Sequence, residues 1–290
     1  MIKQKRLLVW LIVLVLAGIC LIGFLAYDNG RPFQIPAKEH LFTGVEYARK
    51  VNFSPRPMII HTITIDTRAN GIRFLVTPPD DIGSRSPLRA RTTSQFMQEF
   101  GVQIAVNGDG FSPWWSHSPM DYYPHIGDPV QPRGETASRG NVYWTSIATE
   151  PTMYISSHNR MSFDEPGKPF NAISGKDLLV MGGHAIPDLD NSTAQPRTAI
   201  GYSNGGRFFY LVVVDGRQPF YSEGITLNEL ADLMITVGAR YAMNLDGGGS
   251  STMVVADKDG RARILNSPID NLIPGRERPV ADHLGIYVTK

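Results

Sequence analysis

The chain has 290 residues, and its 42% hydrophobic and 19% charged content is typical of a globular protein rather than a disordered one. A formal net charge of +1 gives no overall basic surface, which argues against nucleic acid as a partner. The single cysteine, Cys20, excludes an internal disulfide and favours a bacterial envelope protein over a bridged secreted eukaryotic domain.

The N-terminal segment is long and apolar enough to span a membrane. Lys3, Lys5 and Arg6 precede an uncharged run over residues 7–26. About 20 helical residues cross the hydrocarbon core of a bilayer, so this run matches one transmembrane helix. Basic flanks stay in the cytoplasm, and we therefore expect the remainder of the chain on the other side of the membrane.

Two alternatives to a retained anchor remain for this segment. A cleaved signal peptide has a shorter apolar stretch and a small-x-small cleavage site, whereas no convincing A-x-A motif occurs here. A lipoprotein signal has small residues before its cysteine, whereas Ile19 precedes Cys20. We expect residues 1–27 to be a cytoplasmic stub and anchor, residues 28–39 a linker, and residues 40–290 one domain outside a bacterial inner membrane, on its periplasmic or cell-surface side.

Short strands dominate the pattern beyond the linker. Met58–Ile65 has β-branched strand character, and Arg73–Thr77 is expected to be its partner strand. A hairpin is expected near the C-terminus, from Thr252–Ala256 and Arg261–Leu265. Further strands are expected at Val102–Val106, Val142–Ile147, Thr152–Ser156, Asp177–Met181, Phe208–Val214 and Tyr241–Leu245.

Two helices interrupt the strands. Thr92 and Gln95 form a capping box before Thr93–Phe100, and Gly101 ends this helix. The same signals surround Leu227–Val237. Few helices among many strands predict an α+β fold, with a mixed, mainly antiparallel sheet, a few packed helices and one preceding transmembrane helix.

The stretch from Phe111 to Asn141 shows no periodicity. It is rich in proline, glycine and aromatic residues, and we expect one long loop. Loops of this length are usually functional or disordered, and the aromatic residues argue against disorder.

Two segments of the chain resemble each other. From Gly101 the sequence reads G-V-Q-I-A-V-N-G-D-G, and from Gly238 it reads G-A-R-Y-A-M-N-L-D-G. Both place an asparagine two residues before an aspartate, which suggests two half-sites that meet at one cleft. The alternative is chance convergence of a common helix-to-strand connection.

Six stretches of the sequence resemble the phosphodiester glycosidase family. They are N-G-D-G-F at Asn107–Phe111, R-T-A-I-G at Arg197–Gly201, V-V-D-G-R at Val213–Arg217, G-I-T-L-N-E-L-A at Gly224–Ala231, N-L-D-G-G-G-S-S-T at Asn244–Thr252 and E-R-P-V-A-D at Glu277–Asp282. The resemblance extends over residues 40–290 and implies a phosphodiester glycosidase-type hydrolase with a carbohydrate phosphodiester substrate. Bacterial members are linked to exopolysaccharide or cell-wall sugar metabolism. The loop over residues 112–139 departs from the family pattern, so the resemblance leaves the sugar open.

The residue types in these stretches suit a phosphodiester. Arg197 and Arg217 are planar donors that match phosphate oxygens. Gly247–Gly249 can expose consecutive backbone N–H groups to an oxyanion, and Ser250 and Thr252 add hydroxyl groups. The expected substrate-binding residues are Asn107, Gly108, Trp114, Trp115, Arg197, Thr198, Arg217, Asn244, Gly247, Gly248, Gly249, Ser250, Thr252 and Arg278.

One carboxylate is expected to carry the reaction. Phosphate is a good leaving group, so the site needs less acid catalysis than an ordinary glycosidase pair supplies. We expect Asp246 to act as base, nucleophile or cation stabiliser, because a strand end followed by glycines should present it in the open. Asp109 is the expected second carboxylate, and Asp215 and Glu277 are expected to orient the others.

Simpler interpretations exist for each group. Asp-Gly is common turn chemistry, so Asp246 could be a turn residue. Arg197 and Arg217 could form surface ion pairs, and Trp114 and Trp115 could anchor a loop instead of stacking on a sugar.

We expect no metal and no cofactor. The four-residue spacing of His117, Asp121 and His125 invites a metal site, but Pro119 and Pro124 break any helix there. The expected function is hydrolysis of a sugar-1-phosphodiester in an envelope polysaccharide or its precursor. The alternatives are a non-catalytic glycan-binding component of an exopolysaccharide assembly and a metal-dependent phosphodiesterase. The sequence does not predict the oligomeric state.

Overall fold

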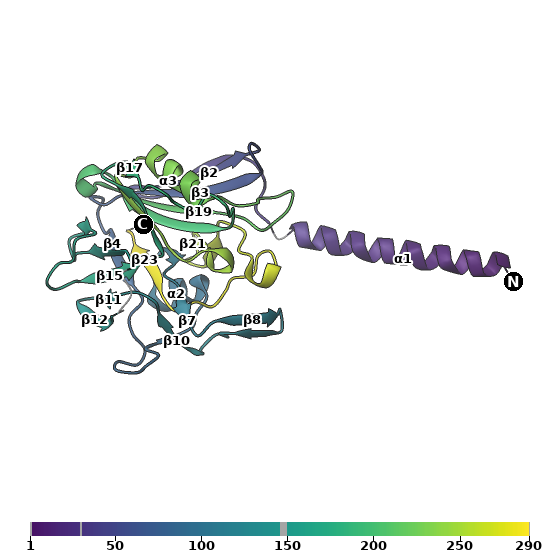
Figure 1. Cartoon of the computed structure of the whole chain (residues 1–290), viewed down its shortest axis with the longest axis horizontal. Coiled ribbons are helices and arrows are strands. Elements are labelled where there is room, and N and C mark those ends of the chain that lie inside the picture. Colours follow the sequence, from purple (N-terminus) through teal and green to yellow (C-terminus); the bar gives the residue numbers. More distant parts are fainter. Residues whose placement is uncertain (1, 30, 146–149, 290) are drawn as a thin grey trace. The chain divides into compact units, whose positions relative to one another are not determined.

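A computed structural model describes residues 2–29, 31–145 and 150–289. The chain divides into two compact units, Met1–Phe33 and Gln34–Lys290, and each is described by itself. The first unit contains α1 (Ile2–Asn29), drawn in purple in Figure 1. Its segment Leu8–Leu25 has a mean hydropathy of 3.0 and is long and apolar enough to cross a membrane. The predicted apolar helix is therefore confirmed, while its retention as an anchor and its orientation stay predictions.

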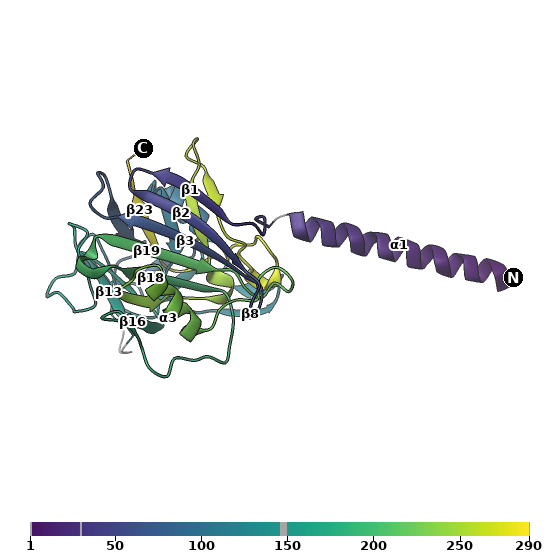
Figure 2. The same cartoon turned by 90° about the horizontal axis from the view of Figure 1, so that it is seen from above.

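The second unit is built around an eight-stranded sheet with the order β1-β2-β3-β19-β18-β20-β16-β17. Every neighbouring pair in it is antiparallel, and Figure 2 shows β1, β2, β3, β19 and β18 side by side. Its strands are β1 (Ala37–Phe42), β2 (Val45–Asn52), β3 (Met58–Asp66), β16 (Asp177–Met181), β17 (His184–Ala185), β18 (Arg197–Tyr202), β19 (Phe208–Val214) and β20 (Tyr241–Asn244).

Two five-stranded antiparallel sheets contribute to the same core. The first has the order β22-β21-β6-β23-β4 and the second β12-β11-β15-β13-β14. The strands of the first are β4 (Arg73–Val76), β6 (Ile104–Asn107), β21 (Met253–Ala256), β22 (Ala262–Ile264) and β23 (His283–Tyr287). Those of the second are β11 (Thr136–Ser138), β12 (Asn141–Trp144), β13 (Thr152–Ile155), β14 (Met161–Ser162) and β15 (Asn171–Ser174).

Shorter elements complete the unit. A three-stranded sheet contains β5 (Leu88–Arg89), β10 (Pro129–Pro132) and β7 (Phe111–Ser112), and β8 (Trp115–Ser118) pairs with β9 (Asp121–Tyr123) in a hairpin. Three short 3-10 turns are η1 (Asn204–Gly206), η2 (Gly248–Ser250) and η3 (Asp270–Leu272).

Both predicted helices of the domain are confirmed, with their caps. In α2 (Thr93–Phe100) the Thr92 and Gln95 side chains form the reciprocal capping box, and Gly101 follows in the left-handed conformation. In α3 (Leu227–Thr236) Thr226 and Glu229 form the second box. Figure 2 shows α3 lying over β16 and β18 of the large sheet.

The core lies between the large sheet and the two five-stranded sheets. Alternate residues of β3 and β19, such as Ile63 and Leu211, pack against β6 and β23 residues such as Val106 and Leu284. The period-two pattern of apolar residues in these strands therefore decides which face is buried. The predicted α+β fold with mainly antiparallel sheets is confirmed.

Several local predictions were wrong. Arg73–Thr77 is not the partner of Met58–Ile65, because β4 pairs with β23 in another sheet while β3 lies between β2 and β19. The stretch over residues 111–141 is not one loop, because it contains β7 to β11 and the start of β12. These strands have two to four residues each, too few to show a periodicity.

The strands that the sequence missed also include β1, β2, β5, β14, β15, β17 and β23. Because β1 begins at Ala37, it starts within the predicted linker over residues 28–39. The predicted strand end at Ile147 lies outside the described residues. The division of the chain into anchor, linker and domain stays a prediction.

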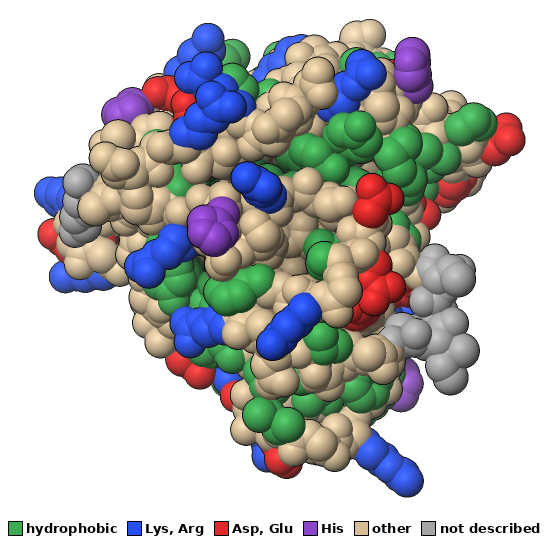
Figure 3. Space-filling view, turned by 90° about the vertical axis from the view of Figure 1, so that its left-hand side faces the viewer, with side chains coloured by type: hydrophobic (Ala, Val, Ile, Leu, Met, Phe, Trp, Pro, Cys, Tyr) green, Lys and Arg blue, Asp and Glu red, His purple; other side chains and the backbone are tan. Residues whose placement is uncertain are grey.

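The surface of the domain mixes side-chain types on the face drawn in Figure 3. Basic side chains are spread over it, and hydrophobic side chains gather toward its upper right, next to acidic ones. This face therefore carries no uniform charge.

Candidate active site

A cavity of about 270 Å³ lies at one end of the large sheet. Four neighbouring strands reach it: β18 begins there with Arg197, β19 and β20 end just before Arg217 and Asp246, and Lys176 directly precedes β16. β6 of the facing sheet ends nearby, just before Gly110. The lining residues are Gly110, Phe111, Trp114, Arg133, Lys176, Gln195, Arg197, Arg217, Asp246, Gly247, Gly248 and Arg278.

Asp246 is held rigidly at the wall of this cavity. Its Oδ1 forms an ion pair with Nζ of Lys176, and Ser250 Oγ donates a hydrogen bond of 2.6 Å to its Oδ2. Its backbone N–H donates to the carbonyl of Gly108 at 3.0 Å. Only 7% of the residue is exposed, so the prediction that Asp246 stands in the open was wrong. Its contacts fold the carboxylate into the wall, where it still lines the cavity.

The glycine run after Asp246 makes room for two arginines. Gly248 has φ +64°, and a Cβ atom there would lie 2.8 Å from Nη1 of Arg217. A Cβ atom on Gly249 would collide with the guanidinium of Arg278. The predicted row of free backbone donors was wrong in part, because the N–H of Gly248 donates to the carbonyl of Pro196 at 2.9 Å.

Two arginines of the cavity have no ion-pair partner among the described residues. Arg197 is 6% exposed, and its Nε finds no hydrogen-bond partner there either. Arg217 Nη2 donates to the side-chain oxygen of Gln195 at 2.8 Å, a neutral acceptor. Burial lowers the pKa of Arg197, and burial with the neighbouring Arg278 lowers the pKa of Arg217. Both side chains therefore present positive charge that an anion in the cavity would neutralise.

Three further basic side chains line the cavity with acidic partners of their own. Arg278 Nε donates to Asp270 at 2.7 Å, and its Nη1 donates to Ser250 Oγ at 3.3 Å. Arg133 forms a 3.3 Å ion pair with Glu150, and Lys176 pairs with Asp246. Among the described residues that line the cavity, Asp246 is the only one with an acidic side chain.

A set of buried polar residues fixes the backbone behind Asp246. Asn107 Nδ2 donates to the carbonyl of Asp246 at 2.8 Å, and Thr198 Oγ1 donates to Asn107 Oδ1 at 2.8 Å. The N–H of Thr252 donates to the same Oδ1 at 3.2 Å. Asn244 Nδ2 donates to Asp177 at 2.9 Å. The structure thus places these four predicted binding residues behind the cavity wall and not on it.

The two similar segments do meet, as the half-site idea predicts. The backbone bond between Asp246 and Gly108 joins them at the ends of β20 and β6. Their aspartates differ, however, because Asp109 is fully buried and outside the lining. Its carboxylate accepts hydrogen bonds from the N–H groups of Gly110 at 2.6 Å and Gly134 at 2.8 Å. Gly110 lines the cavity, and Gly134 follows the lining residue Arg133.

A second buried carboxyl group lies beside Asp109. Asp282 Oδ1 accepts a 3.0 Å bond from the N–H of Asp109, and its Oδ2 has no partner among the described residues. Burial raises the pKa of Asp282 to about 7. Burial and the charges of Asp282 and Glu150 raise the pKa of Asp109.

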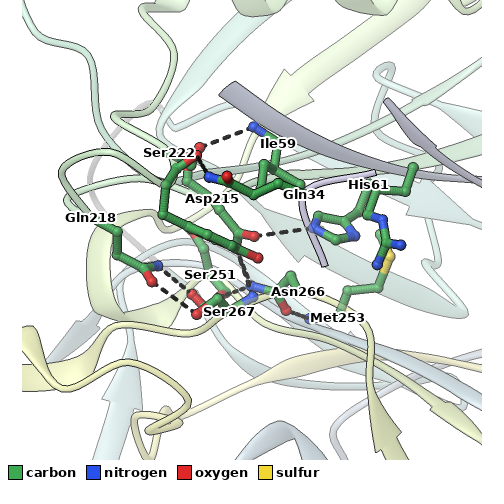
Figure 4. Close-up of polar contacts among 12 residues, drawn as sticks. Gln34, Ile59, His61, Asp215, Gln218, Ser222, Ser251, Met253, Asn266 and Ser267 are labelled. Atoms are coloured by element: carbon green, nitrogen blue, oxygen red, sulfur yellow. Dashed lines mark hydrogen bonds and ion pairs between the residues drawn. The ribbon is translucent and has the colours of Figure 1, made fainter. Parts of the chain in front are cut away.

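Asp215 belongs to a different, closed cluster, which Figure 4 shows. Its carboxylate accepts bonds from His61 Nε2 at 3.1 Å, Asn266 Nδ2 at 3.1 Å and the N–H of Ser267 at 2.8 Å. His61 Nδ1 in turn contacts the Tyr47 hydroxyl at 2.8 Å. Asp215 and His61 are buried, and neither lines the cavity.

Glu277 caps a helix instead of facing the cavity. Its Oε1 accepts a 2.9 Å bond from the N–H of Ser94 in the first turn of α2. Burial raises the pKa of Glu277. The structure therefore places this predicted site residue outside the lining, at an element it stabilises.

The two tryptophans predicted to bind substrate, Trp114 and Trp115, differ in whether they line the cavity. Trp114 lines the cavity, and Arg278 lies over its ring at 5.0 Å. Trp115 lies in the β8–β9 hairpin, where its ring stacks on His117 at 5.1 Å and Tyr123 at 6.2 Å, and it does not line the cavity.

The predicted absence of a metal stays a prediction. Within the described ranges, no three histidine, cysteine or acidic side chains are arranged to hold a metal. His117 contacts Asp121 at 3.3 Å, whereas His125 contacts Asp128 at 3.5 Å.

The sequence missed several lining residues. Lys176, Arg133 and Gln195 enter the cavity from segments that carry no recognised motif. Lys176 reaches Asp246 because its N–H donates to the carbonyl of Asn244 at 2.8 Å, in the β16–β20 pairing. Only this long-range pairing brings the lysine to the carboxylate, and no local sequence signal contains it.

One carboxylate among basic side chains, in a cavity on a fold of facing antiparallel sheets, suits an anionic ligand. Residues 100–287 match the phosphodiester glycosidase family. The chain belongs to this family, which confirms the predicted family and its enzyme class of phosphodiester glycosidase-type hydrolases.

Individual relatives show how far the likeness extends. Over 97 residues the chain is 37% identical to the SPbeta prophage-derived uncharacterized protein YomE of Bacillus subtilis (strain 168). The matched region covers 33% of this chain and 13% of that protein. The chain thus spans only a small part of that relative.

Two solved structures share the fold. The catalytic domain of zebrafish N-acetylglucosamine-1-phosphodiester alpha-N-acetylglucosaminidase, auto-inhibited by its pro-peptide, superposes with a TM-score of 0.60 at 19% identity, over 89% of this chain and 87% of that one. A hypothetical protein from Synechocystis gives a TM-score of 0.61 at 14% identity, over 85% of this chain and 62% of that one. At these identities the likeness shows the fold, and the roles of individual residues stay predictions.

Proposed function

We propose that the chain hydrolyses a sugar-1-phosphodiester of an envelope polysaccharide or its precursor. The observation that carries the proposal is a single carboxylate, Asp246, in a cavity whose other charged lining groups are basic. A phosphodiester carries one negative charge, and paired guanidinium groups are suited to hold it. Membership of the phosphodiester glycosidase family supports the reaction class.

The geometry suggests how such a substrate would lie. Arg197 and Arg217 are the cavity cations without an acidic partner among the described residues, so the phosphate would lie against them. Trp114 offers an apolar face, 49% exposed, to a sugar ring. The anomeric carbon would then lie near Asp246.

Asp246 would act on the anomeric carbon as general base for a water molecule, as nucleophile, or as stabiliser of positive charge. The bond between the anomeric carbon and the phosphate oxygen breaks, and its electron pair leaves with the phosphate. The oxygen of water ends on the sugar, and the phosphate remains on the second alcohol as a monoester. Lys176 and Ser250 would hold the carboxylate in position throughout.

One carboxylate is enough for this leaving group. Ordinary glycosidases use two carboxyl groups, about 5 to 9.5 Å apart, because an alcohol leaves only when it is protonated. The anion of a phosphate monoester is a far weaker base than an alkoxide, so it can leave without being protonated. Among the described residues, only Asp246 places a carboxylate in the cavity lining. Asp109, Asp215 and Glu277 would support the site through the backbone segments that they hold.

The N-terminal helix supports a proposed location for the reaction. We propose that the domain lies on the extracytoplasmic side of a bacterial inner membrane, because basic residues precede the apolar segment Leu8–Leu25. An envelope polymer would be accessible there.

Turnover by the full chain in detergent micelles tests the proposal. Synthetic diesters with a sugar 1-phosphate and a methyl group are the substrates, with and without EDTA. We expect release of methyl phosphate in both conditions. Loss of all activity in EDTA would favour the metal-dependent phosphodiesterase, and binding without turnover would favour the glycan-binding protein.

A further inference from the structure

Two further hollows lie beyond the catalytic cavity on the domain. The nearer one, of about 340 Å³, is lined by residues that include Glu150, Tyr154 and Leu178. The farther one, of about 670 Å³, is lined by residues that include Tyr202 and Tyr241. Phe163 and Met181 line both, so the two hollows are adjacent. We call them together the distal groove.

The Arg133–Glu150 ion pair links this groove to the catalytic cavity. Arg133 lines the cavity, Glu150 lines the near end of the groove, and their side chains meet at 3.3 Å. Their contact therefore marks the boundary between the two spaces.

Strand β16 runs alongside the catalytic cavity and both hollows of the distal groove. Lys176, just before the strand, lines the catalytic cavity, Leu178 lines the near hollow and Met181 lines both hollows. The register of β16 against β20 shifts between Leu178 and Val180. Such a bulge changes the alternation of faces, which lets Leu178 and Met181 face the same groove. At a rise of about 3.3 Å per residue, Lys176 and Met181 lie roughly 17 Å apart along the strand.

The far end of the groove contains a stack of aromatic rings. Tyr202 lies 4.9 Å from Tyr241 at an interplanar angle of 21°, and Phe163 lies 6.2 Å from Tyr202 at 24°. Phe163 and Tyr241 are partly exposed. Arg68 and Asp164 line the same hollow, so apolar faces stand beside hydrogen-bonding groups. This combination suits sugar rings, which have apolar faces and hydroxyl edges.

We propose that the distal groove binds further sugar residues of the chain whose phosphodiester is cleaved. This inference rests on the proposed function and deepens it, because it makes the substrate an oligosaccharide or polysaccharide and not a single glycosyl phosphodiester. The occupants are neutral sugars. Glu135, Glu150 and Asp164 line the groove together with Arg68 and Arg160, so its charges nearly balance and its polar groups can bind the hydroxyl groups of neutral sugars.

Substrate length tests the proposal. The full chain in detergent micelles is given methyl phosphodiesters of single sugars and of neutral tetrasaccharides of glucose, galactose and N-acetylglucosamine. Met181→Lys places a charged chain in the groove without touching the core, because Met181 is 41% exposed. Met181→Leu is the matched control, and Tyr241→Ala is a second variant that removes part of the aromatic stack.

We expect Met181→Lys to lower kcat/KM for a tetrasaccharide substrate by at least about tenfold, within the range for losing contacts at one subsite. Turnover of the single-sugar substrate should stay within about twofold, and Met181→Leu should behave as wild type. Equal kcat/KM for short and long substrates in every variant would overturn the proposal that the groove binds sugars, and would leave the proposed function unaffected.

Failure of the proposed function gives a different result. If wild type turns over no substrate, binding of the phosphate-free tetrasaccharides is measured by calorimetry. Binding that Met181→Lys weakens by at least about tenfold supports the groove as a glycan site. No binding of any tetrasaccharide to wild type overturns it.

Discussion

Asp246 and Asp215 follow strands that flank β18 on its two sides, and each is followed by glycine. Asp246 meets a lysine and a serine at the wall of a basic cavity. Asp215 meets an imidazole, an amide and a backbone N–H in a sealed cluster (Figure 4). The two sites differ in the side chains that distant segments bring to them, such as Lys176 at Asp246 and His61 at Asp215.

This difference shows what a strand-end Asp-Gly motif decides and what it leaves open. The motif provides a carboxylate at a turn, where a strand releases the chain. Asp246 becomes a candidate catalytic group because arginines and Lys176 converge beside it with space for a ligand. Asp215 becomes structural because His61, Asn266 and the N–H of Ser267 all bind its carboxylate in a buried cluster.

The sharpest contrast should come from Asp246→Asn. We expect kcat to fall by at least about a hundredfold, the lower range for a positioned acid–base group. The fold should be retained, because Lys176 is 37% exposed at its side chain and can be solvated without its partner. Steady-state kinetics and thermal melting in one preparation measure both effects. Wild-type turnover in the variant would make Asp246 a turn residue, and joint loss of activity and stability would make it scaffold.

Arg197→Ala should act on substrate binding. Removing a charged hydrogen-bond donor should cost about 1.5–3 kcal/mol of binding free energy for a phosphodiester, and much less for a neutral aryl glycoside. Inhibition constants for both ligands measure this difference. Arg263→Ala is a matched control, because Arg263 pairs with Glu39 away from the cavity lining. Equal losses on both ligands would assign Arg197 a structural role.

Asp215→Ala should show the reverse pattern. It leaves the buried partners His61, Asn266 and Ser267 without their acceptor, which should lower the free energy of unfolding by about 1–3 kcal/mol. The kcat of the protein that remains folded should change little, since Asp215 does not line the cavity. Denaturant titration and active-site-normalised kinetics separate the two. A large kcat loss with unchanged stability would contradict the assignment of Asp215 to the scaffold.

The smallest effect should be a pH dependence of stability at Asp282. Its pKa rises from the ordinary 3.8 to about 7 in the folded protein, so folding favours the protonated form and this group's contribution falls as pH rises from about 4 to 7. His283 acts in the opposite direction, because burial lowers its pKa from 6.5 to about 3, and its contribution rises through that range.

Asp282→Asn removes the first of these two opposing contributions. The melting temperature of the variant should rise relative to that of wild type as pH increases from about 4 to 7, and the difference should be largest at about pH 8. Melting curves across this range test the sign. A melting-temperature difference that does not change with pH would show that Asp282 does not titrate there.

Local signals predicted much of the fold. The capping boxes at Thr92 and Thr226 predicted the starts of both domain helices, and apolar runs predicted β16 and β19 at their observed bounds. The pairing of the strands was harder to predict than their positions. The partner of β4, for example, is β23, which lies more than two hundred residues later in the sequence. Such contacts depend on the assembled core and leave no mark in a short window of sequence.

The candidate site was predicted in its residues more than in its geometry. Asp246, Arg197 and Arg217 do line one cavity. The exposure of Asp246 was wrong because Gly108 and Ser250 fold its backbone and carboxylate into the wall. Lys176 was missed because its position depends on the pairing of β16 with β20.

The bond that breaks tests the central claim most directly. Turnover of a glycosyl phosphodiester in water enriched in oxygen-18, followed by mass spectrometry of both products, shows where the oxygen of water ends. The account predicts the heavy oxygen on the released sugar and none on the phosphate monoester, because Asp246 acts at the anomeric carbon. Heavy oxygen on phosphate would show cleavage of the phosphorus–oxygen bond and contradict the account.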